Sequence, residues 1–168
     1  PISESVYSNT VVYNYVPCAP ELVGSPTLVS NTCINSSSGS ATFTFNRALA
    51  NSEYFNMTLY KENGVNDILV GSEQVTQSQF TNQQFSWPGL EAGTYYLKYQ
   101  TFLGSSTTPT SENYSAAFTI TAPAAVTFTK TSQNVLCGGA ATGSITVAAS
   151  GGNGSYNYSK DNGATWQT

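Results

Sequence analysis

The sequence predicts an all-β fold of tandem β-sandwich modules, the second of them truncated. Three observations carry this prediction. Hydrophobic residues make up 39% and aromatic residues 12%, while charged residues make up only 8%, against roughly 25% in an average soluble domain. Thr, Tyr, Val and Phe suit strands, whereas the helix formers Lys, Glu and Arg are scarce. Short alternating apolar runs are bounded by turn residues, and one such pattern occurs twice.

The repeated pattern begins with a cysteine and a glycine six positions later, Cys33 with Gly39 and Cys137 with Gly143. An alternating apolar run follows each glycine. Every residue of the second run lies 104 positions after its equivalent in the first run, and Gly143 likewise lies 104 positions after Gly39. The runs are Ala41, Phe43 and Phe45 in the first copy, and Ile145, Val147 and Ala149 in the second. Both copies are therefore expected to contain a strand with one apolar face.

A second alternating strand and a polar turn follow in each copy. The turns are Lys61–Gly64 and Lys160–Gly163, which lie 99 positions apart. The difference in spacing falls in the loop between the two strands, where length is weakly constrained. The alternating residues of these strands are Phe55, Met57 and Leu59 in the first copy, and Tyr156 and Tyr158 in the second.

Proline content and the repeat predict the division of the chain. Residues 1–16 are expected to be the terminal strand of a preceding module or an extra edge strand. Residues 17–26 are expected to be a linker, because they contain three prolines, which cannot donate to a central ladder. Residues 27–122 form the first sandwich. Residues 123–168 are expected to be the front half of a second sandwich, whose remaining strands follow in the native protein.

Seven short strands are expected within residues 27–122, a number typical of a sandwich. They are Thr27–Cys33, Ser40–Asn46, Tyr54–Lys61, Asp67–Gly71, Gln79–Trp87, Gly93–Phe102 and Tyr114–Thr121.

The segment Leu90–Leu97 resembles the E to F corner of immunoglobulin-like domains. In that corner a tyrosine hydroxyl bonds back across the turn and the second residue after it points into the core, roles that Tyr95 and Leu97 fit. A plain glycine turn before an amphipathic strand stays an alternative. Trp87 is expected in the core or at a corner rather than on a ligand platform. The full fold prediction is therefore tandem immunoglobulin-like or fibronectin-III-like β-sandwich modules.

The three cysteines, Cys18, Cys33 and Cys137, cannot all pair within one chain. A bridge between Cys18 and Cys33 would contribute about 3 kcal/mol by the loop-entropy estimate. Against it, Cys33 and Cys137 are equivalent in the repeat, and Ala122 stands where the second copy would need a partner cysteine. Both outcomes stay open.

The chain contains no histidine, which removes the commonest general base and the commonest zinc ligand. We therefore expect no enzyme activity and assign no catalytic, cofactor-binding or metal-binding residue. Cys137 is expected to be structural, and Gly151–Gly154 a strand connection rather than a phosphate loop. Asp161–Gly163 and Asn63–Gly64 could offer oxygen ligands to calcium, but tight hairpin turns demand the same residues.

The net charge is −4, and the basic residues are scattered, so nucleic acid is not expected as a partner. No apolar run reaches the roughly 18 to 20 residues that span a bilayer. The basic residues are Arg47, Lys61, Lys98, Lys130 and Lys160.

A distinctive set of residues lies in the second copy, at about 134–168: Cys137, Gly143, Ser144–Val147, Gly151, Gly152, Tyr156–Ser159, Asp161–Gly163 and Trp166. With these residues, the second copy resembles the SprB repeat of very large cell-surface adhesins from gliding Bacteroidetes. The first copy, at about 27–64, is more loosely similar, because it lacks the Gly-Gly pair and has Met57–Tyr60 in place of Tyr-x-Tyr-Ser. The resemblance implies a filament on the outside of the outer membrane, exported by the type IX pathway and moved by the gliding machinery.

We therefore expect a non-catalytic repeat module that acts as a filament spacer and adhesion scaffold. An extracellular surface or polysaccharide and proteins of the gliding or secretion machinery are its expected partners. Two alternatives stay open. One is a carbohydrate-binding accessory module of a secreted enzyme, suggested by the 11 tyrosines, which would need exposed coplanar aromatic rings. The other is a structural component of an outer-membrane or secretion assembly.

Overall fold

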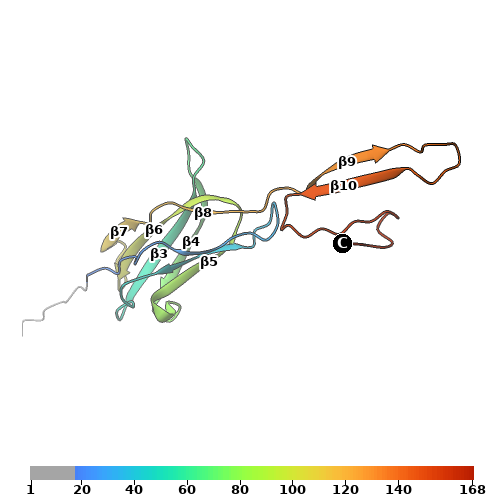
Figure 1. The fold of residues 1–168 in the computed structure, drawn as a ribbon. Coiled ribbons are helices and arrows are strands. Elements are labelled where there is room, and N and C mark those ends of the chain that lie inside the picture. Colours follow the sequence, from blue (N-terminus) through green and yellow to red (C-terminus); the bar gives the residue numbers. More distant parts are fainter. Residues whose placement is uncertain (1–17) are drawn as a thin grey trace, which may run out of the picture.

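The computed structural model describes residues 18–168, which form two parts that follow one another along the chain (Figure 1). Regular structure in both parts is nearly all strand, and this confirms the predicted all-β fold. The segment 1–16, for which a terminal strand was predicted, lies outside the described residues, as does Pro17.

The first part is a sandwich of two antiparallel sheets. One sheet has the order β1-β2-β5, and the other has the order β4-β3-β6-β7 with β8 also paired to β6. The strands of the first sheet are β1 (Thr27–Val29), β2 (Gly39–Thr44) and β5 (Gln84–Leu90). Those of the second are β3 (Glu53–Lys61), β4 (Ile68–Thr76), β6 (Gly93–Leu103), β7 (Ser111–Tyr114) and β8 (Phe118–Ile120).

The core lies between these two sheets and is rich in aromatic rings. Phe45 packs against Phe55 with ring centroids 4.9 Å apart and meets Phe80 and Tyr99 edge-on at 5.3 and 5.4 Å. Edge-to-face and offset pairs of this kind add to the free energy of apolar burial. The residues predicted to face inward from β2, from Phe45 just after it and from β3 are all 0–1% exposed: Ala41, Phe43, Phe45, Phe55, Met57 and Leu59.

The predicted corner before β6 is confirmed. The Tyr95 hydroxyl donates a hydrogen bond of 2.9 Å to the Glu91 carbonyl oxygen, and Leu97 is fully buried. Trp87 is also a core residue, as predicted: it is 7% exposed and its ring lies against Gly71.

Four expected strands differ from those that the structure has. The strand expected at Asp67–Gly71 is β4, which continues to Thr76 because it pairs with β3 along its whole length. The strand expected at Tyr114–Thr121 forms only as β8, and a strand that was not expected, β7, ends at Tyr114. The two are separated because Ser115 leaves the regular ladder: its N–H donates to the Leu97 carbonyl and its hydroxyl accepts from the Leu97 N–H. The strand expected from Gln79 begins only at Gln84, after a short 3-10 turn in which Asn82 and Gln83 have positive φ. β1 ends early, because Asn31 bonds to Thr121 at the end of β8 in the other sheet.

Part of the segment expected to be a linker is bonded to the sandwich. Leu22 forms an antiparallel bridge with Phe45, and the Val23 N–H donates to the Thr44 carbonyl at 2.8 Å. Residues 21–23 therefore extend the first sheet beyond β1 and are not an unpaired linker.

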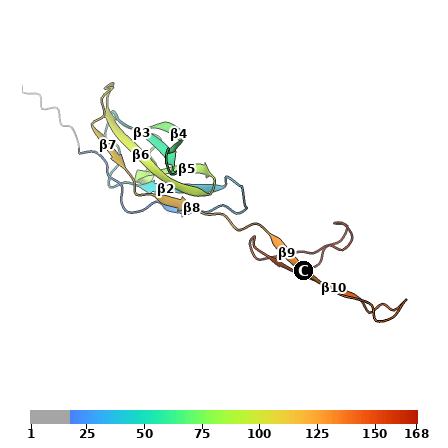
Figure 2. The ribbon, with the colours of Figure 1, turned by 90° about the horizontal axis from the view of Figure 1, so that it is seen from above.

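The second part is a two-stranded antiparallel hairpin, β9 (Thr127–Gln133) with β10 (Ser144–Ser150), followed by a long loop to the last residue (Figure 2). The strand expected around Tyr156 and Tyr158 is not formed, and Tyr158 makes only an isolated bridge with Gln167. A strand needs a neighbour along its length, and within the described residues this loop has none. The predicted polar turn at Asp161–Gly163 is present, with Asn162 and Gly163 at positive φ.

All three cysteines are exposed and unpaired. The Cys18 carbonyl is bonded to Arg47, which follows β2, whereas Cys33 precedes β2. The six residues of β2 separate the two ends by about 20 Å, far beyond the roughly 7 Å limit between bridged Cα atoms. The structure therefore has the unbridged form of the two open outcomes.

Candidate functional site at the module junction

The chain enters and leaves the first module at opposite ends. The proximal end, as we call it, holds Cys18, Arg47 and Glu53, and the distal end holds Asn31 and Thr121. β1 and β8, the first and last strands of the module, both run toward the distal end, because each pairs antiparallel with a strand running the other way. The module therefore lies lengthwise in the path of the chain (Figure 1).

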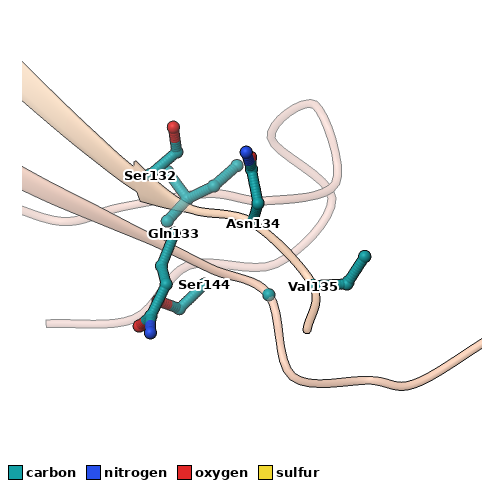
Figure 3. Close-up of a pocket in the computed structure, with 7 residues that line it drawn as sticks. Ser132, Gln133, Asn134, Val135 and Ser144 are labelled. Carbon is teal, nitrogen blue, oxygen red and sulfur yellow. The ribbon is translucent and has the colours of Figure 1, made fainter. Parts of the chain in front are cut away.

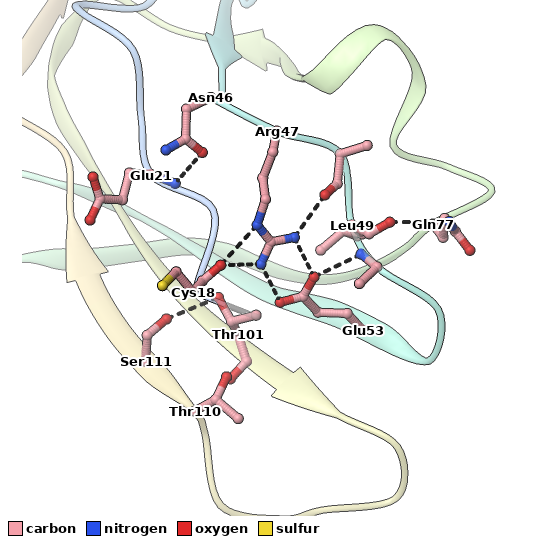
Figure 4. A network of polar contacts seen from close by, with 12 residues as sticks. Cys18, Glu21, Asn46, Arg47, Leu49, Glu53, Gln77, Thr101, Thr110 and Ser111 are labelled. Carbon is pink, nitrogen blue, oxygen red and sulfur yellow. Dashed lines mark hydrogen bonds and ion pairs between the residues drawn. The ribbon is translucent and has the colours of Figure 1, made fainter. Parts of the chain in front are cut away.

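At the proximal end, Arg47 connects the incoming chain to the sandwich (Figure 4). Its Nε donates to the Cys18 carbonyl at 2.8 Å, and a second guanidinium nitrogen bonds to the same oxygen. The guanidinium also forms a two-pronged ion pair with Glu53, at 2.7 and 2.9 Å, whose side chain is 3% exposed. Paired charge-assisted bonds of this kind fix direction as well as distance.

Further backbone bonds hold the same segment. The Glu21 N–H donates to Asn46 Oδ1, and the Asn46 N–H donates to the Glu21 carbonyl. The Glu53 carboxylate in turn accepts from the Ala50 N–H at 2.8 Å. The loop that follows β2 is thus tied both to the incoming chain and to β3.

At the distal end, the side chain of Asn31 organises a loop and its backbone holds the outgoing chain. Asn31 is 4% exposed, and its Oδ1 accepts from the N–H groups of Ser38 and Gly39 at 2.8 and 2.9 Å. Its own N–H donates to the Thr121 carbonyl at 2.9 Å, beside a bond between the Ser30 and Thr121 hydroxyls.

The link between the two modules is two residues long. Before the link, the Thr121 carbonyl accepts from the Asn31 N–H of the first module, and after it the Ala124 carbonyl accepts from the Gly152 N–H of the second module at 2.8 Å. Only Ala122 and Pro123 lie between them. Proline fixes its own φ and restricts the residue before it to extended conformations, so this link has few conformations to choose from.

One face of the β9–β10 hairpin is apolar and exposed, and we call it the hairpin face. Cross-strand pairs on this side place Ile145 opposite Ser132, Val147 opposite Lys130 and Ala149 opposite Phe128, while the threonines of both strands lie on the other side. Phe128, Ile145 and Val147 are 68, 74 and 41% exposed. The β2 residues equivalent to Ile145 and Val147 are Ala41 and Phe43, which are 0 and 1% exposed in the core of the first module. The hairpin face therefore corresponds to a sandwich core.

A hollow of about 680 Å³ lies at the end of the hairpin between Gln133, Val135 and Gly143 (Figure 3). In the first module the equivalent glycine, Gly39, is surrounded: a Cβ there would lie 2.6 Å from Ile120 and 2.7 Å from the Leu90 carbonyl. The hollow therefore marks the place that such groups fill in a complete module, and its chemistry does not suggest a ligand.

Three tyrosines on the outer face of the second sheet, Tyr60, Tyr96 and Tyr114, form a row across β3, β6 and β7, but they do not form a flat platform. Tyr60 and Tyr96 are stacked on each other, with centroids 5.2 Å apart and planes at 16°, and Tyr114 is tilted by 46° from Tyr96. The Tyr96 hydroxyl donates to Asp67, which raises the pKa of Tyr96 to about 12. Because Tyr60 and Tyr96 are stacked on each other and Tyr114 is tilted away from their plane, the row gives the carbohydrate-binding alternative no support.

The turn considered for calcium uses its carboxylate internally. Asp161 accepts hydrogen bonds from the Thr165 hydroxyl, the Thr165 N–H and the Ser159 hydroxyl. These bonds, that of the Thr165 hydroxyl first, lower the pKa of Asp161 to about 2. The Asp161 carboxylate thus accepts hydrogen bonds from residues of its own turn, which agrees with the interpretation of this segment as a tight turn.

In residues 18–168, no three His, Cys, Asp or Glu side chains gather as metal ligands would. In the same range, no helix has the length and apolar character that crossing a membrane requires.

Sequence reasoning missed the two residues that hold the ends of the first module. Arg47 is the one arginine of a chain with 8% charged residues, and Glu53 follows six positions later. That isolation was a usable signal for a buried pair. Asn31 carries no such signal, because the sequence is rich in asparagine.

Residues 129–165 match the family model described as SprB repeat. This confirms the resemblance over that segment, which covers most of β9, all of β10 and the loop through Asp161. No curated protein matches the chain. SprB repeats are typical of cell-surface proteins, and the match suggests a repeat module of the cell-surface adhesin type.

Proposed function

We propose that the chain is a non-catalytic spacer and adhesion scaffold within a large bacterial cell-surface adhesin. The match to the SprB repeat supports the adhesin assignment, and the internal duplication supports an array of modules. No catalytic step, cofactor or metal enters this proposal.

The observation that carries the spacer role is the placement of the two chain ends. The incoming chain is held at the proximal end by Arg47 and the outgoing chain at the distal end by Asn31, with the length of the sandwich between them. β6 alone has 11 residues, which corresponds to about 35 Å of reach. Each module thus adds its long dimension to the length of the filament.

With the chain ends at opposite ends of the module, tension along the filament acts parallel to the terminal strands, which is the direction in which a sheet resists best. Tension along the chain pulls β1 along β2 and β8 along β6, so several ladder hydrogen bonds must break together. β1 makes three residue pairs with β2, and β8 makes three with β6. Phe118 and Ile120 of β8 are in addition buried in the core.

Gliding motility and export by the type IX pathway are part of the proposal and are supported by the SprB family match alone. An antibody against this chain is expected to label intact cells of the source bacterium. Labelling should be lost in a strain that lacks type IX export. Labelling that appears only after cell lysis would count against the surface location.

Single-molecule pulling tests the spacer role, with handles at the two ends of the chain. We expect the first module to unfold in one step that adds roughly 300 to 350 Å of length, because about 100 residues extend by up to about 3.5 Å each. An unfolding force no higher than the detection threshold would overturn the proposal. A chain carrying Ile120→Ala provides the comparison, since loss of this buried side chain weakens β8 and should lower the force.

A further inference from the structure

The loop Gly151–Gly154, which we call the glycine loop, folds back onto the link between the modules. Its Gly152 N–H donates to the Ala124 carbonyl at 2.8 Å. A Cβ on Gly151 would lie 2.2 Å from the Ala125 carbonyl oxygen, and one on Gly152 would lie 2.8 Å from Val126 Cγ2. Both glycines also have positive φ, of 86° and 56°. Only residues without a side chain allow this close approach.

The next residue of the loop reaches the first module. Asn153 Nδ2 donates a hydrogen bond of 3.1 Å to the carbonyl oxygen of Thr32, which lies in the distal loop of the first module. The glycine loop therefore contacts both the link and the module that precedes it. It spans the two residues, Ala122 and Pro123, that could otherwise act as a hinge.

The first module holds its own incoming chain with the loop at the same place. Arg47 is the position equivalent to Gly151, 104 residues earlier, and its guanidinium holds the Cys18 carbonyl. The two copies thus perform the same task with different chemistry. The first copy uses the charged side chain of Arg47. The second copy uses glycine backbone, which can contact the link because it carries no side chain.

The carbonyl that receives Asn153 has an equivalent in the second module. The Thr32 N–H bonds to the Ser38 hydroxyl, and 104 positions later the Leu136 N–H bonds to the Thr142 hydroxyl. The turns after them correspond as well, with Ser36 N–H bonded to Cys33 and Ala140 N–H bonded to Cys137. The distal loop is thus rebuilt in the second copy, with the Leu136 carbonyl where the Thr32 carbonyl lies.

We propose that the glycine loop is an intermodule clasp whose partner is the distal loop of the preceding module. It fixes the direction of one module relative to the next by closing over a two-residue link. In an array, the Leu136 carbonyl of this repeat receives the asparagine of the following glycine loop. The inference deepens the proposed spacer role, since it assigns the stiffness of the array to a named contact.

Two substitutions break the clasp in different ways, and each has a matched control. Gly151→Ala introduces a side chain that collides with the link, whereas Gly154→Ala adds one at a similarly positive φ of 81° with nothing within 4 Å. Asn153→Ala removes the bond to Thr32, whereas Asn157→Ala removes an exposed asparagine elsewhere in the same module.

The measurement is the distance distribution between two spin labels on the full chain, by pulsed electron paramagnetic resonance. The labels are placed at Val65→Cys, which is 93% exposed in the first module, and at Thr146→Cys in β10, with the three native cysteines replaced by serine. We expect a narrow distribution in the parent and both controls, and a broader one in Gly151→Ala and Asn153→Ala. Amide chemical shifts of β9 and β10 report whether the hairpin stays formed in each variant. If Gly151→Ala disrupts the hairpin, the clasp is judged from the distance distribution of Asn153→Ala alone.

A parent distribution as broad as that of the Asn153→Ala chain would overturn the clasp, as would equal broadening in the controls. Such a result is distinct from failure of the spacer role. The pulling experiment reads the strength of the first module, which does not include the glycine loop, so a strong module with a loose joint would remove only the clasp.

Discussion

Phe43 and Val147 occupy the same place in the two copies of the repeat, yet Phe43 is 1% exposed and Val147 is 41% exposed. Phe43 packs against Phe118 of β8, and the two rings meet edge-on with centroids 5.5 Å apart. Within the described residues, the strands that would cover Val147 in this way are lacking. The same sequence position therefore contributes very differently to the stability of the chain.

Truncating these two residues should separate their contributions. Phe43→Ala is expected to lower the free energy of unfolding by about 3 to 5 kcal/mol, since a buried ring leaves a cavity. Val147→Ala should change it by no more than about 0.5 kcal/mol, as exposed substitutions do. Urea unfolding followed by circular dichroism measures both. Equal losses would show that the hairpin face is covered in solution.

Removing the arginine of the proximal end should be costly. Arg47→Met is expected to destabilise the first module by about 2 to 4 kcal/mol, because it leaves the Glu53 carboxylate buried without its partner. Lys98→Met is the matched control, since Lys98 pairs with Glu112 at 3.0 Å on the exposed face, where such pairs contribute about 1 kcal/mol or less. Thermal unfolding of both variants makes the comparison. Similar losses in the two variants would contradict a special role for Arg47.

Adding a methyl group at Gly39, the first residue of β2, should lower the stability of the first module. Gly39→Ala places its Cβ 2.6 Å from Ile120 Cγ2 and 2.7 Å from the Leu90 carbonyl oxygen, so the module must shift at a cost of about 1 to 3 kcal/mol. Gly138→Ala serves as the control, because nothing lies within 4 Å of its Cβ position. If denaturant midpoints of the two variants agree, the packing at Gly39 is looser than described.

The corner bond of Tyr95 should be measurable by removing one oxygen. Tyr95→Phe keeps the buried ring and loses the bond to the Glu91 carbonyl, which should cost about 1 kcal/mol. Tyr60→Phe removes a hydroxyl that makes no hydrogen bond to another described residue, and it should be close to neutral. Differential scanning calorimetry compares the two, and an unchanged melting temperature for Tyr95→Phe would refute the corner assignment.

The turn at Asp161 should respond to acid at an unusually low pH. Its pKa is lowered from 3.8 to about 2 by hydrogen bonds, that of the Thr165 hydroxyl first. The contribution of a carboxylate with a lowered pKa is fully present above the ordinary value of 3.8 and is lost as the pH falls through about 2. Carbon-13 titration of the Asp161 carboxyl should give a midpoint near 2, and Thr165→Val should raise it. A midpoint near 3.8 in the parent chain would contradict the described turn.

Sequence patterns predicted the parts of the fold that depend on local alternation. The inward faces of β2, β3 and β6 follow from apolar residues at every second position, and the corner follows from Tyr95 and the turn before it. The turns after Lys61 and Lys160 follow from Asn-Gly pairs, whose positive φ the structure has at Gly64 and Gly163.

Features that depend on contacts between distant residues escaped prediction. The split between β7 and β8 arises from the bonds of Ser115 with Leu97, 18 positions away. The bonding of residues 21–23 to the end of β2 was hidden by the prolines around them. Gly151 and Gly152 were expected only to connect strands. Their contact with the link depends on where residues 124–126 lie in space, which no local sequence pattern encodes.

The two-residue joint also sets the symmetry of an array. A fixed rotation and translation, repeated at every head-to-tail joint, generates a screw axis rather than a closed ring unless the rotation happens to close. The conformations of Ala122 and Pro123 would then determine the pitch and handedness of the whole filament. A single substitution in so short a segment, repeated in every module, would change the helix over its entire length.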